Sequence, residues 1–127
     1  MDKRREYRGY RDLAVYQLSY KLALRIHEIT KSFPKEERYA LTDQIRRSSR
    51  AIPAIIAEAW KKRRYPKAFV SKLSDASAEQ AEVTVWLDFS KDFVYLKDVD
   101  YEELIAGYDE VGAMLHSMME SPRKFVW

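Results

Sequence analysis

Seven arginine and lysine residues lie within residues 44–64, QIRRSSRAIPAIIAEAWKKRR, and Glu58 is the only acidic residue among them. Guanidinium groups form paired hydrogen bonds to phosphate, and lysine ammonium groups bind phosphate as point charges. This stretch therefore predicts contact with the phosphates of RNA or DNA. The predicted nucleic-acid-binding residues are Arg46, Arg47, Arg50, Lys61, Lys62, Arg63 and Arg64.

The spacing of these cations places several of them on one side of a helix. Arg46, Arg50 and Lys61 lie together on a helical wheel, away from the apolar positions. Arg64 lies on the same side, and Arg47 lies close beside it. About 22 Å of helix separates Arg46 from Lys61, which is enough to meet several phosphates. A solvated surface, or one that pairs with another subunit, would carry the same residues, and the sequence leaves these alternatives open.

Residues 1–11 form a basic arm in which aromatic residues alternate with cations: Lys3, Arg4, Arg5, Tyr7, Arg8, Tyr10 and Arg11. Arginine and aromatic side chains together suit the binding of single strands, because bases stack on aromatic rings. A disordered basic tail would have the same composition. The arm therefore either reinforces nucleic-acid binding or is only such a tail.

Other chemistry has little support in the sequence. The chain has no cysteine, and its two histidines, His27 and His116, have no partners at the spacing of metal ligands. Three glycines are too few for the glycine-rich loops that bind nucleotides. The sequence thus predicts no catalytic, metal or cofactor site, and a protein that is not an enzyme.

One aromatic cluster has two interpretations. Trp86, Phe89 and Phe93 follow one another at helical spacing. Such rings can line a ligand pocket, but at this spacing they more often belong to the core or to an interface. We expect them to widen the apolar side of their helix.

The net charge of +3 is unevenly distributed along the chain. Residues 43–67 contain eight Lys or Arg and two Asp or Glu, a local net charge of +6. Residues 68–127 contain five and twelve, a local net charge of −7. This separation creates a positive field that attracts polyanions, and it also permits pairing between basic and acidic surfaces of different subunits.

The length of 127 residues fits one domain. The first residues, MDKRREYRGY, are basic but precede no apolar segment, so no signal peptide is predicted. No stretch approaches the roughly 18 uninterrupted apolar residues of a membrane span. Together with the lack of cysteine, these features predict a cytoplasmic protein without membrane association.

Apolar residues recur every three or four positions in four segments, which predicts helices over residues 12–33, 36–64, 67–96 and 100–120. Asp12 is the expected N-cap of the first helix. Asp100 and Glu103 are the expected capping box of the last. Pro53 should bend the second helix without ending it, because the apolar positions continue in phase on both sides.

The first helix carries a second apolar stripe, on nearly the opposite side from the main one: Leu13, Tyr16, Tyr20 and Leu24. A helix that is apolar on two sides needs two neighbours. Another subunit or the N-terminal arm would cover this stripe.

Helices joined by short connections predict an all-α fold, an antiparallel up-down-up-down four-helix bundle. We expect the basic N-terminal arm over residues 1–11, the bundle over residues 12–120 and a C-terminal tail over residues 121–127. The sequence has no alternating strand pattern and no internal repeat that would favour another architecture.

The segment QIRRSSRAIPAIIAEA, residues 44–59, resembles the signature of the bacterial four helix bundle protein family. That family was first noticed as proteins encoded by intervening sequences within large-subunit ribosomal RNA genes, and its pattern is close to Q-I-R-R-S-A-x-S-I-P-x-N-I-A-E-G. YRDLAVYQLSYKL and FPKEERYAL are similar to the family's first helix and the linker after it. The resemblance extends over about residues 10–118.

This resemblance implies a bundle that assembles as a ring-like homopentamer. Members are similar in fold to the accessory proteins of diversity-generating retroelements, which bind nucleic acid and partner a reverse transcriptase. RNA or DNA, further copies of the chain and a reverse transcriptase are therefore the expected partners. The chain departs from the pattern at Ile55 and Ala59, where the family has Asn and Gly, so apolar surface replaces the polar contact of that asparagine.

Two functions follow from these observations. The first is a non-catalytic, oligomeric bundle that binds RNA or DNA without sequence preference through its basic second helix. The alternative is a protein-interaction scaffold whose basic and acidic surfaces pair between subunits or with a partner protein. Reversing the charge of Arg46, Arg50 and Lys61 would separate the two, since only a scaffold would lose its oligomer or partner.

Overall fold

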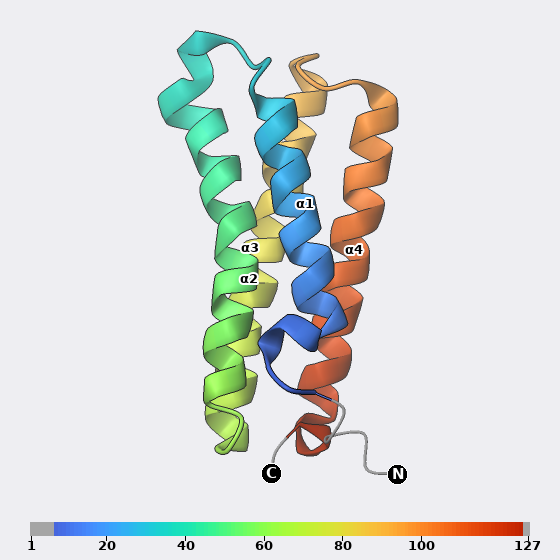
Figure 1. The fold of residues 1–127 in the computed structure, drawn as a ribbon. Coiled ribbons are helices and arrows are strands. Elements are labelled where there is room, and N and C mark those ends of the chain that lie inside the picture. Colours follow the sequence, from blue (N-terminus) through green and yellow to red (C-terminus); the bar gives the residue numbers. More distant parts are fainter. Residues whose placement is uncertain (1–6, 126–127) are drawn as a thin grey trace.

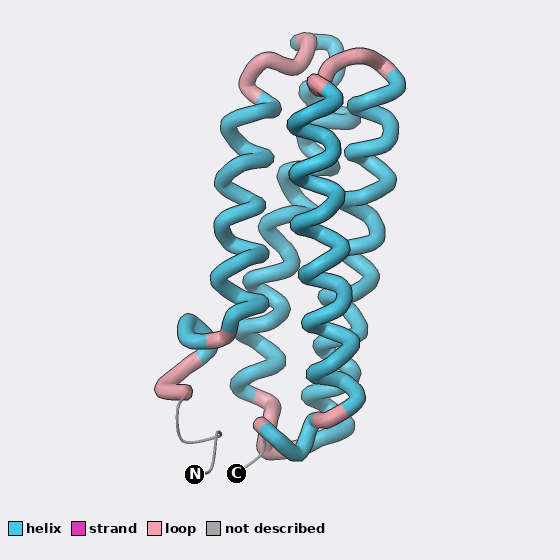
Figure 2. Tube along the Cα trace, turned by 90° about the vertical axis from the view of Figure 1, so that its right-hand side faces the viewer, coloured by secondary structure: helices cyan, strands magenta, loops and turns pink. Residues whose placement is uncertain are grey.

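Four long helices make up the fold of residues 7–125, the part of the chain that this computed structural model describes. They are α1 Ala14–Thr30, α2 Asp43–Lys61, α3 Pro66–Asp92 and α4 Asp98–Glu120. Successive helices run in opposite directions, and α4 packs against α1 to complete the bundle (Figure 1). Loops are confined to the two ends of the bundle and to the entry to α1 (Figure 2). The predicted all-α four-helix bundle is confirmed.

The apolar stripe of each helix faces the bundle interior. The largest fully buried side chains include Ile26 of α1, Ile52 of α2, Phe69 of α3 and Tyr108 of α4. Burying one such side chain contributes roughly 1.5–3 kcal/mol, so these stripes supply most of the stability that holds the helices together. None of the described helices is long and apolar enough to cross a membrane.

The entry to α2 differs from the prediction that this helix begins near residue 36. A 3₁₀ turn over Lys35–Glu37 and a π-helical turn over Arg38–Thr42 precede it, and α2 itself begins at Asp43. The π-helical turn buries Leu41 and Thr42 against the bundle. As the phase of the apolar positions predicted, α2 then continues through Pro53, and it ends at Lys61.

The third helix ends four residues before its predicted end at residue 96. Val94 has a φ of 64°, in the left-handed region. The N–H groups of Val94 and Tyr95 donate to the carbonyls of Lys91 and Ser90, each at 2.9 Å. This is the pattern of a Schellman motif, which usually has glycine where this chain has valine. The prediction was wrong because valine gives no signal for such an ending.

Both predicted helix caps are also wrong. The Asp12 carboxylate accepts a hydrogen bond from the backbone N–H of Arg8, at 2.6 Å, and does not cap α1. Asp100 lies inside the first turn of α4 and accepts a hydrogen bond from Arg25 of α1 at 2.9 Å. In each case the carboxylate accepts a hydrogen bond from a donor outside the helix that it was expected to cap.

Candidate nucleic-acid interface

The seven predicted cations of residues 46–64 do not form one uniform surface, and Arg46 is the clearest example. Its Nε donates a hydrogen bond to Thr30 Oγ1 at 2.8 Å. The buried Thr30 hydroxyl in turn donates to the carbonyl of Ile26 at 2.7 Å. Arg46 therefore links α2 to the C-terminal end of α1, and its main role is structural.

Arg63 is also engaged within the protein, whereas Arg47 is exposed. Burial and the charge of Glu82 raise the pKa of Glu79 on α3, and the nearby charge of Arg47 lowers it. The Arg63 guanidinium lies 3.8 Å above the centroid of the Trp60 ring and donates to the Trp60 carbonyl at 2.8 Å. Burial lowers the pKa of Arg63. Arg63 is therefore held against α2.

The remaining cations of this stretch are more accessible. Glu58, the one acidic residue among them, forms an ion pair with Lys72 of α3 at 2.9 Å. Lys61, Lys62 and Arg64 are exposed, and they form no ion pair within residues 7–125. Because α2 ends at Lys61, the cations that follow lie in the turn between α2 and α3 and not on the helical side predicted for Arg64.

A larger group of cations gathers at one end of the bundle, where distant segments meet. The Tyr7 ring lies 5.9 Å from the Trp60 ring and 5.8 Å from the Phe125 ring, measured between centroids. Phe69 lies 5.9 Å from Phe125 in the same way. These contacts bring both described ends of the chain to the turn between α2 and α3, at the bottom of Figure 1. We call the cations of these segments the basic end: Arg8, Arg11, Lys61, Lys62, Arg63, Arg64, Lys67, Arg123 and Lys124.

The charge of the bundle is polarised along its axis. Residues 7–12, 61–67 and 120–125 contain the nine cations of the basic end and two acidic residues, a local net charge of +7. Residues 25–43 and 88–103 lie at the opposite end and contain six cations and ten acidic residues, a local net charge of −4. Three members of the basic end were not predicted, because they lie outside both predicted stretches: Lys67, Arg123 and Lys124. Arg8 and Arg11 were predicted as members of the N-terminal arm.

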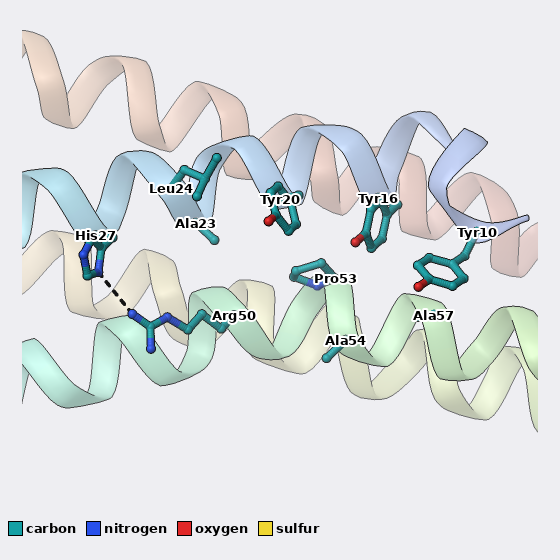
Figure 3. Close-up of a pocket in the computed structure, with 10 residues that line it drawn as sticks. All are labelled: Tyr10, Tyr16, Tyr20, Ala23, Leu24, His27, Arg50, Pro53, Ala54 and Ala57. Atoms are coloured by element: carbon teal, nitrogen blue, oxygen red, sulfur yellow. Dashed lines mark hydrogen bonds between the residues drawn. The ribbon is translucent and has the colours of Figure 1, made fainter.

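A groove between α1 and α2 extends away from the basic end. We call it the tyrosine groove; it has a volume of about 580 Å³ and is lined by Tyr10, Tyr16, Tyr20, Ala23, Leu24, His27, Arg50, Pro53, Ala54 and Ala57. The three tyrosines follow one another along its α1 side, opposite small residues of α2 (Figure 3). At the far end, Arg50 Nη2 lies 3.1 Å from His27 Nδ1.

The tyrosine groove accounts for the second stripe of α1. Leu13 is buried, and the Tyr10 ring packs edge-on against Tyr16 with centroids 5.0 Å apart. Tyr20 and Leu24 stay 50% and 56% exposed. The N-terminal arm therefore covers only the first part of the stripe. Lys3, Arg4 and Arg5 of the predicted arm lie outside the described residues.

A second aromatic surface lies near the C-terminal end of α3, at the end of the bundle opposite the basic end. The rings of Trp86 and Phe89 are 6.0 Å apart, and those of Phe89 and Phe93 are 5.8 Å apart, between centroids. Phe89 and Phe93 are 45% and 51% exposed. With Leu41 and Gln44 they border a shallow pocket of about 520 Å³. We call Trp86, Phe89 and Phe93 the α3 aromatic surface. Trp86 is partly buried against the core, whereas Phe89 and Phe93 are exposed.

The described residues offer little for other chemistry. Among them, no group of three or more His, Asp or Glu side chains is placed to hold a metal ion. His116 lies 3.8 Å from Glu120, and both side chains are well exposed. The features that remain are the basic end, the tyrosine groove and the α3 aromatic surface.

Comparison with known proteins places this arrangement in context. The model of the family described as 23S rRNA-intervening sequence protein matches residues 11–117. Five chains of solved structures match. One is the crystal structure of a protein of unknown function from the S23 ribosomal protein family of Bacteroides thetaiotaomicron; it is 28% identical, covers 84% of this chain and 96% of its own, and has a TM-score of 0.76. No curated protein matches.

Proposed function

Given that the chain belongs to the 23S rRNA-intervening sequence protein family, we propose that it is a non-catalytic protein that binds RNA or DNA through the basic end of its bundle. The observation that carries the proposal is the gathering of nine cations with only two acidic residues. Lysine and arginine side chains on such a surface contact phosphates, and phosphates carry no direct sequence information. The binding is therefore tolerant of sequence, and the proposal places the protein in the cytoplasm, where RNA and DNA are accessible.

The local pairing of charges supports this function over a merely solvated surface. On solvated helices, cations are commonly balanced by acidic residues three or four positions away. Here Glu58 pairs with Lys72 on the neighbouring helix, and Asp12 accepts from a backbone N–H. Lys61, Lys62 and Arg64 remain available to phosphates, so the proposed interface centres on the basic end and not on Arg46.

The proposal predicts how affinity depends on salt. Each phosphate that a protein neutralises on a single strand contributes about −0.7 to the slope of log K against log salt. An interface of about four phosphate contacts would therefore give a slope of about −3. A slope near zero would show that phosphates contribute little.

Charge reversal at the basic end tests the proposal. We expect the triple variant Lys61→Glu, Lys62→Glu and Arg64→Glu to weaken binding of a mixed RNA pool on the order of a hundredfold at about 50 mM salt. The matched control is Lys21→Glu, Lys35→Glu and Lys97→Glu, which changes the net charge equally at exposed positions outside the basic end. Equal losses in both variants would mean that net charge alone drives binding, against a localised interface.

A second function, self-association or docking of a partner protein, is favoured by the α3 aromatic surface. Phe89 and Phe93 are about half exposed, and exposed apolar surfaces of this kind mark interaction sites. The resemblance of residues 44–59 supports a homo-oligomer, with five copies, and a reverse transcriptase as a partner. In the scaffold alternative, in which the basic and acidic surfaces of different subunits pair, the charge-reversal triple at Lys61, Lys62 and Arg64 would change the oligomer mass. In a nucleic-acid-binding protein it would leave the mass unchanged.

A further inference from the structure

We infer that the tyrosine groove binds the unpaired bases of a single strand whose neighbouring phosphates are held by the basic end. This inference rests on the proposed function and adds to it the class of nucleic acid: single-stranded RNA or DNA, in preference to a duplex. The groove and the basic end adjoin, because Arg11 of the basic end lies over the ring of Tyr10, the first ring of the groove, at 4.7 Å from its centroid.

The ring geometry supplies surfaces on which bases can stack. Tyr16 and Tyr20 are one helical turn apart, with centroids 5.8 Å apart and planes inclined by 30°. Tyr20 is half exposed, so one aromatic ring in the groove is accessible without any rearrangement. Aromatic rings bind every base in this way, because every base has a π-face.

The opposite wall leaves room for a base. Pro53, Ala54 and Ala57 of α2 line this side of the groove and have short side chains, and Figure 3 shows Pro53 opposite the row of tyrosines. The volume of about 580 Å³ lies in the range of about 300–1,000 Å³ that is usual for small-molecule sites. A duplex keeps its bases stacked in its interior and presents no base face to such a groove.

The charges of the groove fit an anionic strand. None of the ten residues that line it is acidic, and Arg50 is exposed at its far end. Glu28 of α1 and Glu58 of α2 face other partners, in ion pairs with Lys31 and Lys72. An anionic strand would therefore meet cations at both ends of the groove and no carboxylate between them.

The polar atoms of the groove also favour a nucleic acid over an apolar protein segment. Within residues 7–125, the hydroxyls of Tyr10, Tyr16 and Tyr20 form no hydrogen bond. An apolar helix laid on the groove would bury these three hydroxyls without hydrogen-bond partners, which is unfavourable. Base edges, sugars and phosphates offer each of them a partner.

The test compares a labelled oligouridylate of about 12 nucleotides with a duplex of the same length, in the whole protein. We expect Tyr20→Ala to weaken oligouridylate binding about tenfold and to leave duplex binding unchanged. Tyr20→Phe keeps the aromatic ring and should retain most of this binding, because it loses only the hydroxyl. The control Tyr39→Ala removes a tyrosine that is 81% exposed at the other end of the bundle and should have no effect.

Each result of this comparison has a defined meaning. If Tyr20→Ala binds oligouridylate unchanged while the charge-reversal triple loses binding, the inference that bases bind in the tyrosine groove is wrong and the proposed function stands. Failure of the unmodified protein to bind either nucleic acid would overturn both. A change in oligomer mass in Tyr20→Ala, with unchanged oligouridylate binding, would show that a second copy of the chain covers the groove.

Cross-links from a 4-thiouridine-substituted strand should map to Tyr16 or Tyr20; cross-links only at the basic end would contradict the inference.

Discussion

Arg46 and Arg50 are one helical turn apart on α2, and both approach His27 of α1, Arg46 at the backbone carbonyl and Arg50 at the ring. Their roles nevertheless differ. Arg46 is half-buried, and its Nε donates to the buried Thr30 hydroxyl at 2.8 Å. Arg50 is exposed, and its contact with His27 Nδ1 at 3.1 Å lies at the surface of the groove. The difference arises because Arg46 lies one turn nearer to the C-terminal end of α1, where carbonyls lack partners within the helix.

We therefore expect Arg46→Ala to lower the free energy of unfolding by about 1–2 kcal/mol, because it removes a hydrogen bond from a charged donor to a buried hydroxyl. Arg50→Ala should change it by less than about 0.5 kcal/mol, as exposed substitutions usually do. Urea denaturation of the two variants measures both values. If Arg50→Ala destabilises the protein as much as Arg46→Ala, the division between the two arginines is wrong.

The hydrogen bond between Tyr101 and Asp88 should affect how the free energy of unfolding depends on pH. The Tyr101 hydroxyl donates to Asp88 Oδ1 at 2.6 Å, and this hydrogen bond to a carboxylate raises the pKa of Tyr101 from 10.0 to about 12. A pKa that is raised in the folded state stabilises the protein fully below pH 10, and this contribution is lost as the pH rises from 10 to about 12.

The variant Tyr101→Phe cannot titrate, so we expect its stability to fall less steeply than that of the unmodified protein between pH 10 and about 12. Denaturation of both proteins across this range measures the difference. Tyr65→Phe is a suitable control, because the Tyr65 ring is exposed and its hydroxyl forms no hydrogen bond within the described residues. Parallel curves for Tyr101→Phe and the unmodified protein would contradict the role of Asp88.

At the scale of the elements, the end of α3 stores strain in Val94. Its φ of 64° brings the Cβ atom close to the backbone, at a cost of roughly 1–2 kcal/mol for a residue other than glycine. The side chain is 85% exposed, so it gains little burial in return. The hydrogen bonds of the motif at Lys91 and Ser90 keep the turn in place nevertheless.

We expect Val94→Gly to raise the free energy of unfolding by about 1 kcal/mol, because glycine adopts this backbone conformation without strain. Val94→Ala keeps a Cβ atom and should recover much less. Thermal unfolding of the two variants compares them directly. Equal stabilities for the glycine and alanine variants would show that the left-handed conformation is not strained.

The elements themselves could be predicted well from the sequence, but their ends and partners could not. Apolar residues at every third or fourth position define which side of each helix is buried, and Ile52 and Leu104 lie where this spacing predicts. The caps at Asp12 and Asp100 failed because both carboxylates bind donors from other segments, which spacing along one helix cannot reveal. The tyrosine groove could not be predicted, because the sequence alone does not show that the second stripe of α1 lies opposite Ala54 and Ala57 of α2.

At the scale of the whole molecule, the bundle separates its charges between its two ends. The sequence showed a basic stretch over residues 43–67, but Arg8 and Arg123 lie near opposite ends of the chain. The packing of Tyr7 and Phe125 against each other, and against Trp60 and Phe69, brings these two segments to one end of the bundle. In the proposal, the basic end attracts phosphates, the tyrosine groove takes the bases, and the α3 aromatic surface is left for another copy of the chain.

The mass of the particle in solution, measured by light scattering with and without oligouridylate, tests this account most directly. At about 50 mM salt we expect the mass to rise by that of the bound strand, and at about 300 mM salt we expect the strand to be released, because phosphate contacts weaken steeply with salt. A particle whose mass does not change with oligouridylate at either salt would contradict the account, and the basic end would then be a surface for protein contacts.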